Sequence, residues 1–288
     1  MLRFVPGNKS ETSVTINFLK SRAGLMYLGQ CLPDNSGLAF LGIPFGEHYK
    51  LREQLEQLRN SEVLQMYSLE EVEWLRNVSF NPIFFDFKSR TWNFDWTDAE
   101  NSKEPLLTPE AKEEQAPIID YKDILILKEL QKGVPRTLSK LSKTIEIDQH
   151  NLRYHHKHHV RRAISGYYLK MLPVDLPKYQ STLVFIFEPA NDQALLDARA
   201  VALTIPFTQS VWKCDRNYCW YVSCPGMYTN EVMSYVNEKF LKIPGALRHI
   251  PINSSTEFTD TIPHHLFNEH RGCWEYDPEA PLSPPVKK

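Results

Sequence analysis

The order of strand-like and helix-like segments between residues 182 and 256 constrains the fold more than any other feature of this sequence. The region opens with an apolar run, and its second helical segment places Val232, Val236 and Leu241 at helical spacing. In chain order the pattern is β-α-β-β-α-β, which predicts a ferredoxin-like split βαβ unit. The segments are TLVFIFE (182–188), NDQALLDARAVALTIP (191–206), SVWKCDR (210–216), YCWYVSCPG (218–226), YTNEVMSYVNEKFLKIPG (228–245) and ALRHIPINSST (246–256).

The first 96 residues are predicted to form a weaker copy of the same kind of unit. Two apolar runs flank the turn PDNSG at 33–37 and indicate a hairpin. The segment 48–61 is an amphipathic helix with its leucines inward, and 63–78 supplies a strand that runs into polar, helix-like sequence. A duplicated α/β unit is therefore expected. Both halves also end in a cluster of Trp and Asp, TWNFDW at 91–96 and GCWEYD at 272–277.

The net charge of −2 hides an uneven distribution of charge along the chain. Residues 121–178 carry twelve Lys and Arg against five Asp and Glu, a net charge of +7. Residues 1–120 and 179–288 have net charges of −6 and −3. A basic segment between two acidic ones is expected when one module meets phosphate and its neighbours do not.

The basic segment opens with an amphipathic helix in DYKDILILKELQKG, residues 120–133. Asp120 or Asp123 marks its start, and Gly133 marks its end. One side of this helix is apolar and is expected to face the protein interior. That side carries Ile124, Leu125, Leu127 and Leu130.

Two further helices joined by a tight turn follow. Thr137 is the expected N-cap of LSKLSKT, whose Leu138 and Leu141 face inward. After the turn IEID, Asp148 is placed to cap QHNLRYHHKHHV. The next segment, AISGYYLKML, alternates β-branched and aromatic residues around a glycine, as a wing or exit strand does. This order predicts a winged helix-turn-helix.

These segments resemble the winged helix-turn-helix of the leucine-responsive/AsnC (feast/famine) transcription regulators. DILILKELQKG, TLSKLSKTIEIDQHNLRYHHKHHV and ISGYYLKMLP follow the opening helix, recognition helix and "V-I-x-G-Y" exit strand of that family. Ala163 stands where a glycine usually precedes the exit strand, and the recognition helix is richer in histidine than is usual. The following β-α-β-β-α-β segments, with a helix ending in IPGALRH, resemble the effector-and-oligomerisation (RAM) domain of the family, so the resemblance spans roughly residues 120–258.

The resemblance implies an α+β architecture, with a winged helix-turn-helix between two ferredoxin-like (βαββαβ, RAM-like) α/β units. It also implies self-association as a homodimer or larger oligomer and a small-molecule effector such as an amino acid, with unknown binding residues. The family starts with the helix-turn-helix, whereas here an α/β unit precedes it. The expected divisions are a degenerate RAM-like domain (1–96), a linker rich in Glu, Pro and Ala (97–119), the winged helix-turn-helix (120–176), a RAM-like domain (177–277) and a Pro-rich tail (278–288).

Helical spacing assigns the faces of the recognition helix. Leu152, His156 and Val160 (or His159) fall on one stripe and are expected to face the other two helices. The outward residues are then expected to contact double-stranded DNA. Arg153 is expected to bind guanine, and Asn151 or Gln149 to bind adenine. The expected phosphate contacts are Lys157, Arg161 and Arg162. The predicted DNA-binding residues are Thr137, Lys140, Gln149, His150, Asn151, Arg153, Tyr154, Lys157, Arg161 and Arg162.

Other interpretations of the segment remain open. His155 and His159 lie one helical turn apart, but no Cys or HExxH-type Glu accompanies them, so no metal site is predicted. His156 is interpreted as a satisfied or partly buried core histidine rather than a metal ligand. Imidazoles that become charged near pH 6.5 would give a pH-sensitive grip on DNA. The basic residues would also suit an ordinary solvated helix face.

Five cysteines indicate a reducing compartment rather than a disulfide framework. Cys214, Cys219 and Cys224 recur at every fifth residue, which fits no zinc-ribbon spacing, so they are expected to pack as small hydrophobic residues. No apolar run approaches the roughly 20 residues that span a bilayer, and the first residues lack a secretory pattern. A cytoplasmic protein without a membrane partner is expected.

Motifs of phosphate cradles and nucleophile elbows, G-x-G-x-x-G, G-x-x-x-x-G-K-[ST] and G-x-S-x-G, do not occur in the sequence. Neither catalysis nor a cofactor is therefore expected. The predicted function is a DNA-binding transcription regulator. The alternatives are a ligand-sensing or protein-interaction module that does not bind DNA directly, and α/β units that bind and turn over a metabolite.

Overall fold

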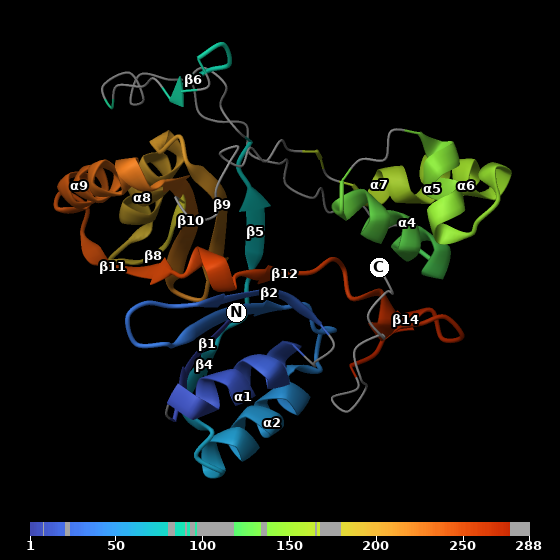
Figure 1. Cartoon of the computed structure of the whole chain (residues 1–288), viewed down its shortest axis with the longest axis horizontal. Helices are drawn as coiled ribbons and strands as arrows, with labels where there is room; N and C mark the ends of the chain where they lie inside the picture. The colour runs from blue at the N-terminus through green and yellow to red at the C-terminus, as the bar shows by residue number, and fades with distance from the viewer. Residues whose placement is uncertain are drawn as a thin grey trace.

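The computed structural model describes residues 1–7, 9–20, 24–79, 84–89, 91–92, 96, 118–133, 137–164, 166–167 and 180–276. Two α/β units and a separate helical unit make up this part of the chain (Figure 1). None of the helices described is both long and apolar enough to cross a membrane. The expected linker and Pro-rich tail lie outside the described residues, apart from 118–119.

The N-terminal unit has the element order β-α-β-β-α-β. Its antiparallel sheet has the strand order β12-β2-β3-β1-β4, and both helices lie on one side of it (Figure 1). The hairpin at 33–37 and the amphipathic helix are confirmed, with Leu51 and Leu55 buried in the core. The elements are β1 (Leu2–Pro6), α1 (Lys9–Lys20), β2 (Leu25–Gln30), β3 (Gly37–Leu41), α2 (His48–Asn60) and β4 (Leu64–Leu69).

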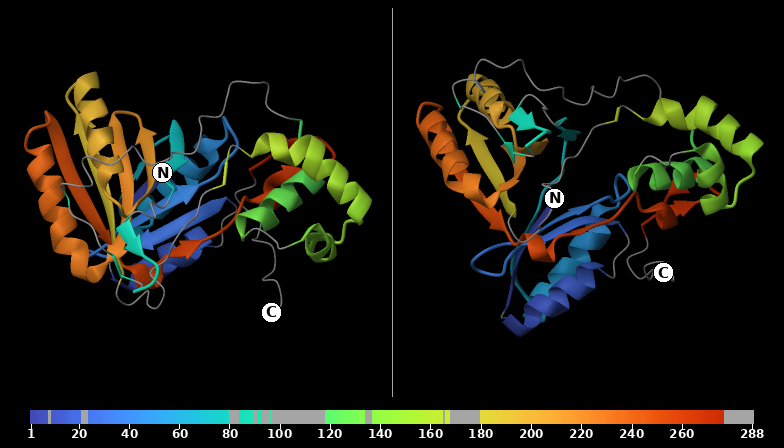
Figure 2. Two further views of the ribbon diagram at one scale, coloured as in Figure 1. Left: turned by 90° about the horizontal axis from the view of Figure 1, so that it is seen from above. Right: turned by 45° about the horizontal axis from the view of Figure 1, so that its top comes forward.

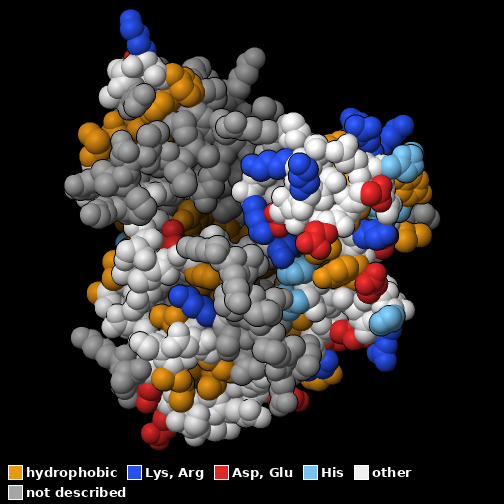
Figure 3. Space-filling model, turned by 45° about the vertical axis from the view of Figure 1, so that its right-hand side comes forward, with side chains coloured by type: hydrophobic (Ala, Val, Ile, Leu, Met, Phe, Trp, Pro, Cys, Tyr) orange, Lys and Arg blue, Asp and Glu red, His pale blue; other side chains and the backbone are white. Residues whose placement is uncertain are grey.

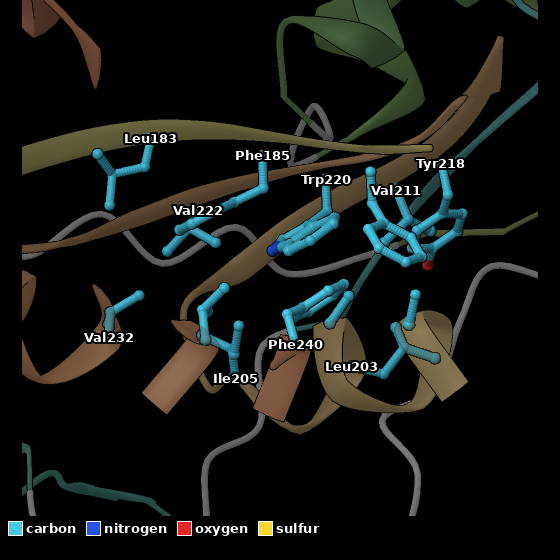
Figure 4. Packing of buried hydrophobic residues seen from close by; sticks show 14 of the residues in the cluster. Leu183, Phe185, Leu203, Ile205, Val211, Tyr218, Trp220, Val222, Val232 and Phe240 are labelled. Atoms are coloured by element: carbon cyan, nitrogen blue, oxygen red, sulfur yellow. The ribbon is translucent and has the colours of Figure 1, made fainter. Parts of the chain in front are cut away.

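The C-terminal unit repeats this order and confirms the predicted β-α-β-β-α-β pattern. Its sheet has the strand order β11-β8-β10-β9-β5, and the Asn191 side chain caps α8 by accepting a hydrogen bond from Ala194 N. Trp220 and Phe185 stack on the helical side of the sheet, where Trp220 also stacks on Phe240 (Figure 4). The elements are β8 (Gln180–Pro189), α8 (Asp192–Thr204), β9 (Thr208–Cys214), β10 (Asn217–Pro225), α9 (Thr229–Phe240) and β11 (Gly245–Ile252).

Each α/β unit completes its sheet with a strand from the segment that follows the other unit. The strand β5 (Trp74–Asn77) pairs antiparallel with β9, and β12 (Phe258–Thr259) pairs antiparallel with β2. The polar, helix-like sequence predicted near residue 74 is therefore a strand, because the edge of the other sheet supplies its hydrogen-bond partners. The exchange also involves side chains: Trp92 and Trp96 pack against the C-terminal unit, whereas Trp274 and Tyr276 pack in the N-terminal unit.

The sheet faces opposite the helices pack together within this one chain. Alternate residues of β8 divide between two cores, so that Val184 and Ile186 meet Leu38 of the N-terminal unit. Phe40 lies edge-on to Trp212 at a centroid distance of 5.1 Å. Figure 2 shows the helices of both units on the outer sides of the paired sheets. A two-layer arrangement of paired sheets is thus formed within one chain.

The cysteines form no disulfide. Cys31, Cys214 and Cys219 are buried between the two sheets, and Cys224 is buried in the C-terminal core, whereas Cys273 is exposed. The prediction that Cys214, Cys219 and Cys224 serve as small apolar residues is confirmed.

The helical unit has a small core of its own, formed by Ile126, Leu141, Leu152 and Val160. Ile126 is buried and Leu125 only half-buried, which corrects the predicted inward side of the first helix. The helix is packed on two sides, because α4 also contacts the segment around η6 (His264–Leu266). The elements are α4 (Tyr121–Gln131), α5 (Leu138–Ile145), α6 (Gln149–His155), the π-helical turn η2 (His156–Val160) and α7 (Arg161–Ala163).

Local sequence signals fix the ends of these helices. Asp120 and Asp123 form a reciprocal capping box at the start of α4, and Gly133 follows its end with a positive φ. Thr137 caps α5 and Asp148 caps α6, each by accepting a hydrogen bond from a backbone N–H. These caps confirm the predicted boundaries. Most of the expected exit strand, from residue 168 on, lies outside the described residues.

Candidate functional site: a basic helix face above a buried Asp–His cluster

The outward side of α6, η2 and α7 carries a basic face, which we define as Arg153, Lys157, Arg161 and Arg162. All four side chains are exposed, and none forms an ion pair with a described residue. Lys, Arg and His side chains gather on this unit in Figure 3. Residues 149–163 contain no acidic residue, so the face has a single sign of charge.

The structure places the other predicted DNA-binding residues around this face. Gln149, His150 and Tyr154 are exposed on α6, and Asn151 is half-buried. Thr137 and Lys140 are exposed on α5. Two of these groups already have partners within the unit: the Gln149 amide donates to Ser139 Oγ, and the Thr137 hydroxyl caps α5.

The inward side of α6 and η2 differs from the prediction at one residue. His155, not His156, is buried beside Leu152 and Val160. The cause is the π-helical turn from His156 to Val160, whose wider spacing shifts the residues that face α4. His156 is half-buried, which agrees with its interpretation as a partly buried histidine.

Beneath the basic face, two aspartates at the start of α4 meet His155 of α6 and His159 of η2. We call Asp120, Asp123, His155 and His159 the Asp–His cluster. The Nδ1 atom of His155 lies 2.8 Å from Asp123 Oδ1, and that of His159 lies 3.0 Å from Asp123 Oδ2. Asp120 Oδ1 lies 3.6 Å from His155 Nδ1. One ligand atom from each of the four residues lies within 4.8 Å of every other.

Burial differs sharply across the cluster. The Asp123 side chain has an exposed fraction of 0%, and the His155 side chain one of 8%. His159 is 29% exposed and Asp120 53% exposed. Asp123 Oδ2 also accepts a hydrogen bond from Asp120 N, so both oxygens of this buried carboxylate have partners. The cluster offers two imidazole nitrogens and two carboxylates to one cation between the two helices.

Sequence reasoning found half of this cluster. His155 and His159 are recognisable as a pair one turn apart, and Asp120 and Asp123 as a helix start. The available signal was that all four residues lie in one short segment with three helices. Spacing alone does not show that the start of one helix faces the middle of another.

A second pair of titratable groups lies where α4 meets the C-terminal segment. Lys128 Nζ lies 3.1 Å from His264 Nε2, and the Gln131 side chain accepts a hydrogen bond from Ile262 N. Burial, and secondarily the charge of Lys128, lowers the pKa of His264 to about 4. Burial also lowers the pKa of Lys128. These contacts attach the helical unit to the segment that continues from β12.

Comparison with known proteins gives matches among solved structures alone: no family model and no curated protein matches the chain. The siroheme decarboxylase NirDL is 13% identical, with a TM-score of 0.47, over 90% of this chain and 72% of that one. Its complex with an iron-uroporphyrin III analogue is 11% identical, with a TM-score of 0.44, over the same shares. The leucine response regulatory protein LrpA of Mycobacterium tuberculosis is 19% identical, with a TM-score of 0.33, over 46% of this chain and 91% of that one.

The expectation that the chain is not an enzyme is corrected here, because a siroheme decarboxylase stands among the structures that it resembles.

Proposed function

We propose that the helical unit binds double-stranded DNA through its basic face and that the protein acts as a transcription regulator. The observation that carries this proposal is the set of four exposed cations without an ion-pair partner in the described chain, on a helix that lacks acidic residues. Exposed cations without an ion-pair partner can neutralise phosphates without first breaking an internal ion pair.

The local geometry supports docking in a major groove. The α6 helix begins at Gln149 directly after the turn from α5, and its N-terminal residues are exposed. An α-helix with side chains is about 10–12 Å wide, close to the roughly 12 Å width of the major groove. In this proposal Arg153 reads guanine, whereas Lys157, Arg161 and Arg162 contact phosphates.

The distribution of charge supports the same orientation. Residues 121–178 have a net charge of +7, and the segments on either side have net charges of −6 and −3. A duplex is attracted to the basic segment in preference to the segments on either side, which orients the encounter. A regulator of this kind reads a palindromic site only with a second copy of the chain, so self-association is part of the proposal.

The test is the salt dependence of binding to a labelled duplex of random sequence, measured by fluorescence anisotropy. The three phosphate contacts of Lys157, Arg161 and Arg162 give a slope of log K against log salt of about −3. Lys157→Ala reduces the magnitude of this slope by about 1. Lys242→Ala, which removes an exposed cation just after the end of α9, leaves the slope unchanged. A Kd that does not vary with salt contradicts the proposal and favours a module that contacts protein or ligand instead.

A further inference from the structure

We propose that the Asp–His cluster is a binding site for one divalent transition-metal ion, and that Zn²⁺ is well matched to its donors. The cluster offers two imidazole nitrogens and two carboxylates from two different helices. Imidazole favours Zn²⁺ and other late first-row metals over Mg²⁺ and Ca²⁺, which prefer oxygen ligands. An ion bound there joins the start of α4 to the recognition helix.

The distances in the cluster are close to those of a four-coordinate site. Zinc lies about 2.0–2.2 Å from nitrogen and oxygen ligands, so neighbouring donors of a tetrahedral site are about 3.3–3.5 Å apart. Here the separations from His155 Nδ1 are 2.8 Å to Asp123 and 3.6 Å to Asp120. Small side-chain movements therefore suffice to place an ion among the donors.

The charge of the cluster also suits a dication. Two carboxylates carry a charge of −2 and neutral imidazoles carry none, so a divalent ion makes the site neutral. Neutrality matters at Asp123, because its carboxylate is fully buried and a buried charge is costly unless it is paired. On binding, each Nδ1 exchanges its contact with Asp123 for the metal, and its hydrogen moves to Nε2 through a change of tautomer.

The backbone holds these ligands in place before any ion arrives. Asp120 is the N-cap of α4 and Asp123 its third residue, and the capping box fixes both side chains. Asp120 Oδ1 accepts from Asp123 N, and the remaining lone pairs of this carboxylate are available to a metal. The π-helical turn directs His155 and His159 to the same side, and such turns occur frequently at functional sites. The exposed Asp120 provides an entry route from solvent.

The experiment is calorimetric titration of the full chain, freed of metal by chelation and of any histidine tag, with Zn²⁺. The expected result is one tight site, matched by one equivalent of Co²⁺ with a tetrahedral absorption spectrum. His159→Gln and Asp123→Asn each weaken Zn²⁺ binding by at least about tenfold. If Asp123→Asn unfolds the helical unit by circular dichroism, the partly exposed His159 provides the decisive variant.

His158→Gln is the matched control. His158 lies on the same helix and packs against Tyr154 as His159 does, but it is exposed and outside the cluster. We expect it to leave the tight site unchanged. Absence of a one-to-one site overturns the proposal, and so does equal weakening by His158→Gln and His159→Gln, which indicates adventitious binding to a histidine-rich surface. Zn²⁺ titration requires no DNA, so its result is separable from that of the DNA-binding test.

Discussion

The Nδ1 atom of His155 lies 2.8 Å from Oδ1 of the fully buried Asp123, and this contact joins the first helix of the helical unit to the basic helix. The carboxylate needs these partners, because an unpaired buried acceptor loses its hydration without compensation. The orientation of the basic face therefore depends on a polar contact in an otherwise apolar core.

Removing this partner destabilises the helical unit. We expect His155→Ala to lower its free energy of unfolding by about 2–4 kcal/mol, because Asp123 stays buried with one partner fewer. His156→Ala, one position along and half-buried, costs below about 1 kcal/mol. Urea unfolding followed by helical circular dichroism measures both, and equal costs for the two variants contradict the assigned inward stripe.

Base preference depends on Arg153 in the DNA-binding proposal. Arg153→Ala is expected to relax selectivity at one guanine position by about 1–3 kcal/mol, because a bidentate contact to the base edge is lost. Lys157→Ala weakens all duplexes alike. Selection of bound fragments from randomised DNA with each variant separates the two effects. If Arg153→Ala and the unmodified protein select the same DNA motif, Arg153 contacts the phosphate backbone of the DNA and does not read a base.

Acid destabilises the contact between α4 and the C-terminal segment. The native pKa of His264 is about 4, against an ordinary value of 6.5, so the unfolded chain binds more protons between these values. Stability therefore falls as the pH drops from about 6.5 to about 4. Burial lowers the pKa of His265 too, which adds in the same sense.

The His264→Gln variant tests this pH dependence. It reduces the loss of thermal stability over that pH range, whereas His270→Gln, at an exposed position, leaves it unchanged. Melting temperatures measured across this range give the comparison. An unchanged profile in His264→Gln assigns the acid sensitivity to other groups.

Gly245 is required at the start of β11. Its φ is +155°, and an added Cβ lies 2.5 Å from Glu188 O and 2.4 Å from the Phe187 ring. We expect Gly245→Ala to cost about 2–5 kcal/mol through strain and overpacking together. Gly133→Ala, at φ +137° with open space around it, costs only the strain, about 1–2 kcal/mol. Chemical denaturation compares them, and equal costs exclude the steric contribution.

Local sequence patterns predicted most helices and strands correctly, but they did not predict which strands pair with each other. The caps at Thr137 and Asp148 and the β-α-β-β-α-β order follow from residue type and periodicity, and both are confirmed. The exchange of β5 and β12 was not predicted, because a strand of four residues or fewer acquires its pairing from a distant sheet edge. The burial of His155 was not predicted, because one wide helical turn changes which residues face inward.

The exchanged edge strands make the two α/β halves interdependent. A fragment that ends before β12 leaves the backbone amides and carbonyls along the outer edge of β2 without their partner, and one that begins after β5 does the same to β9. Open sheet edges recruit other chains. If the chain is divided in its central segment, each fragment is therefore expected to self-associate. The two fragments are expected to bind each other when mixed, and neither to behave as an independent domain.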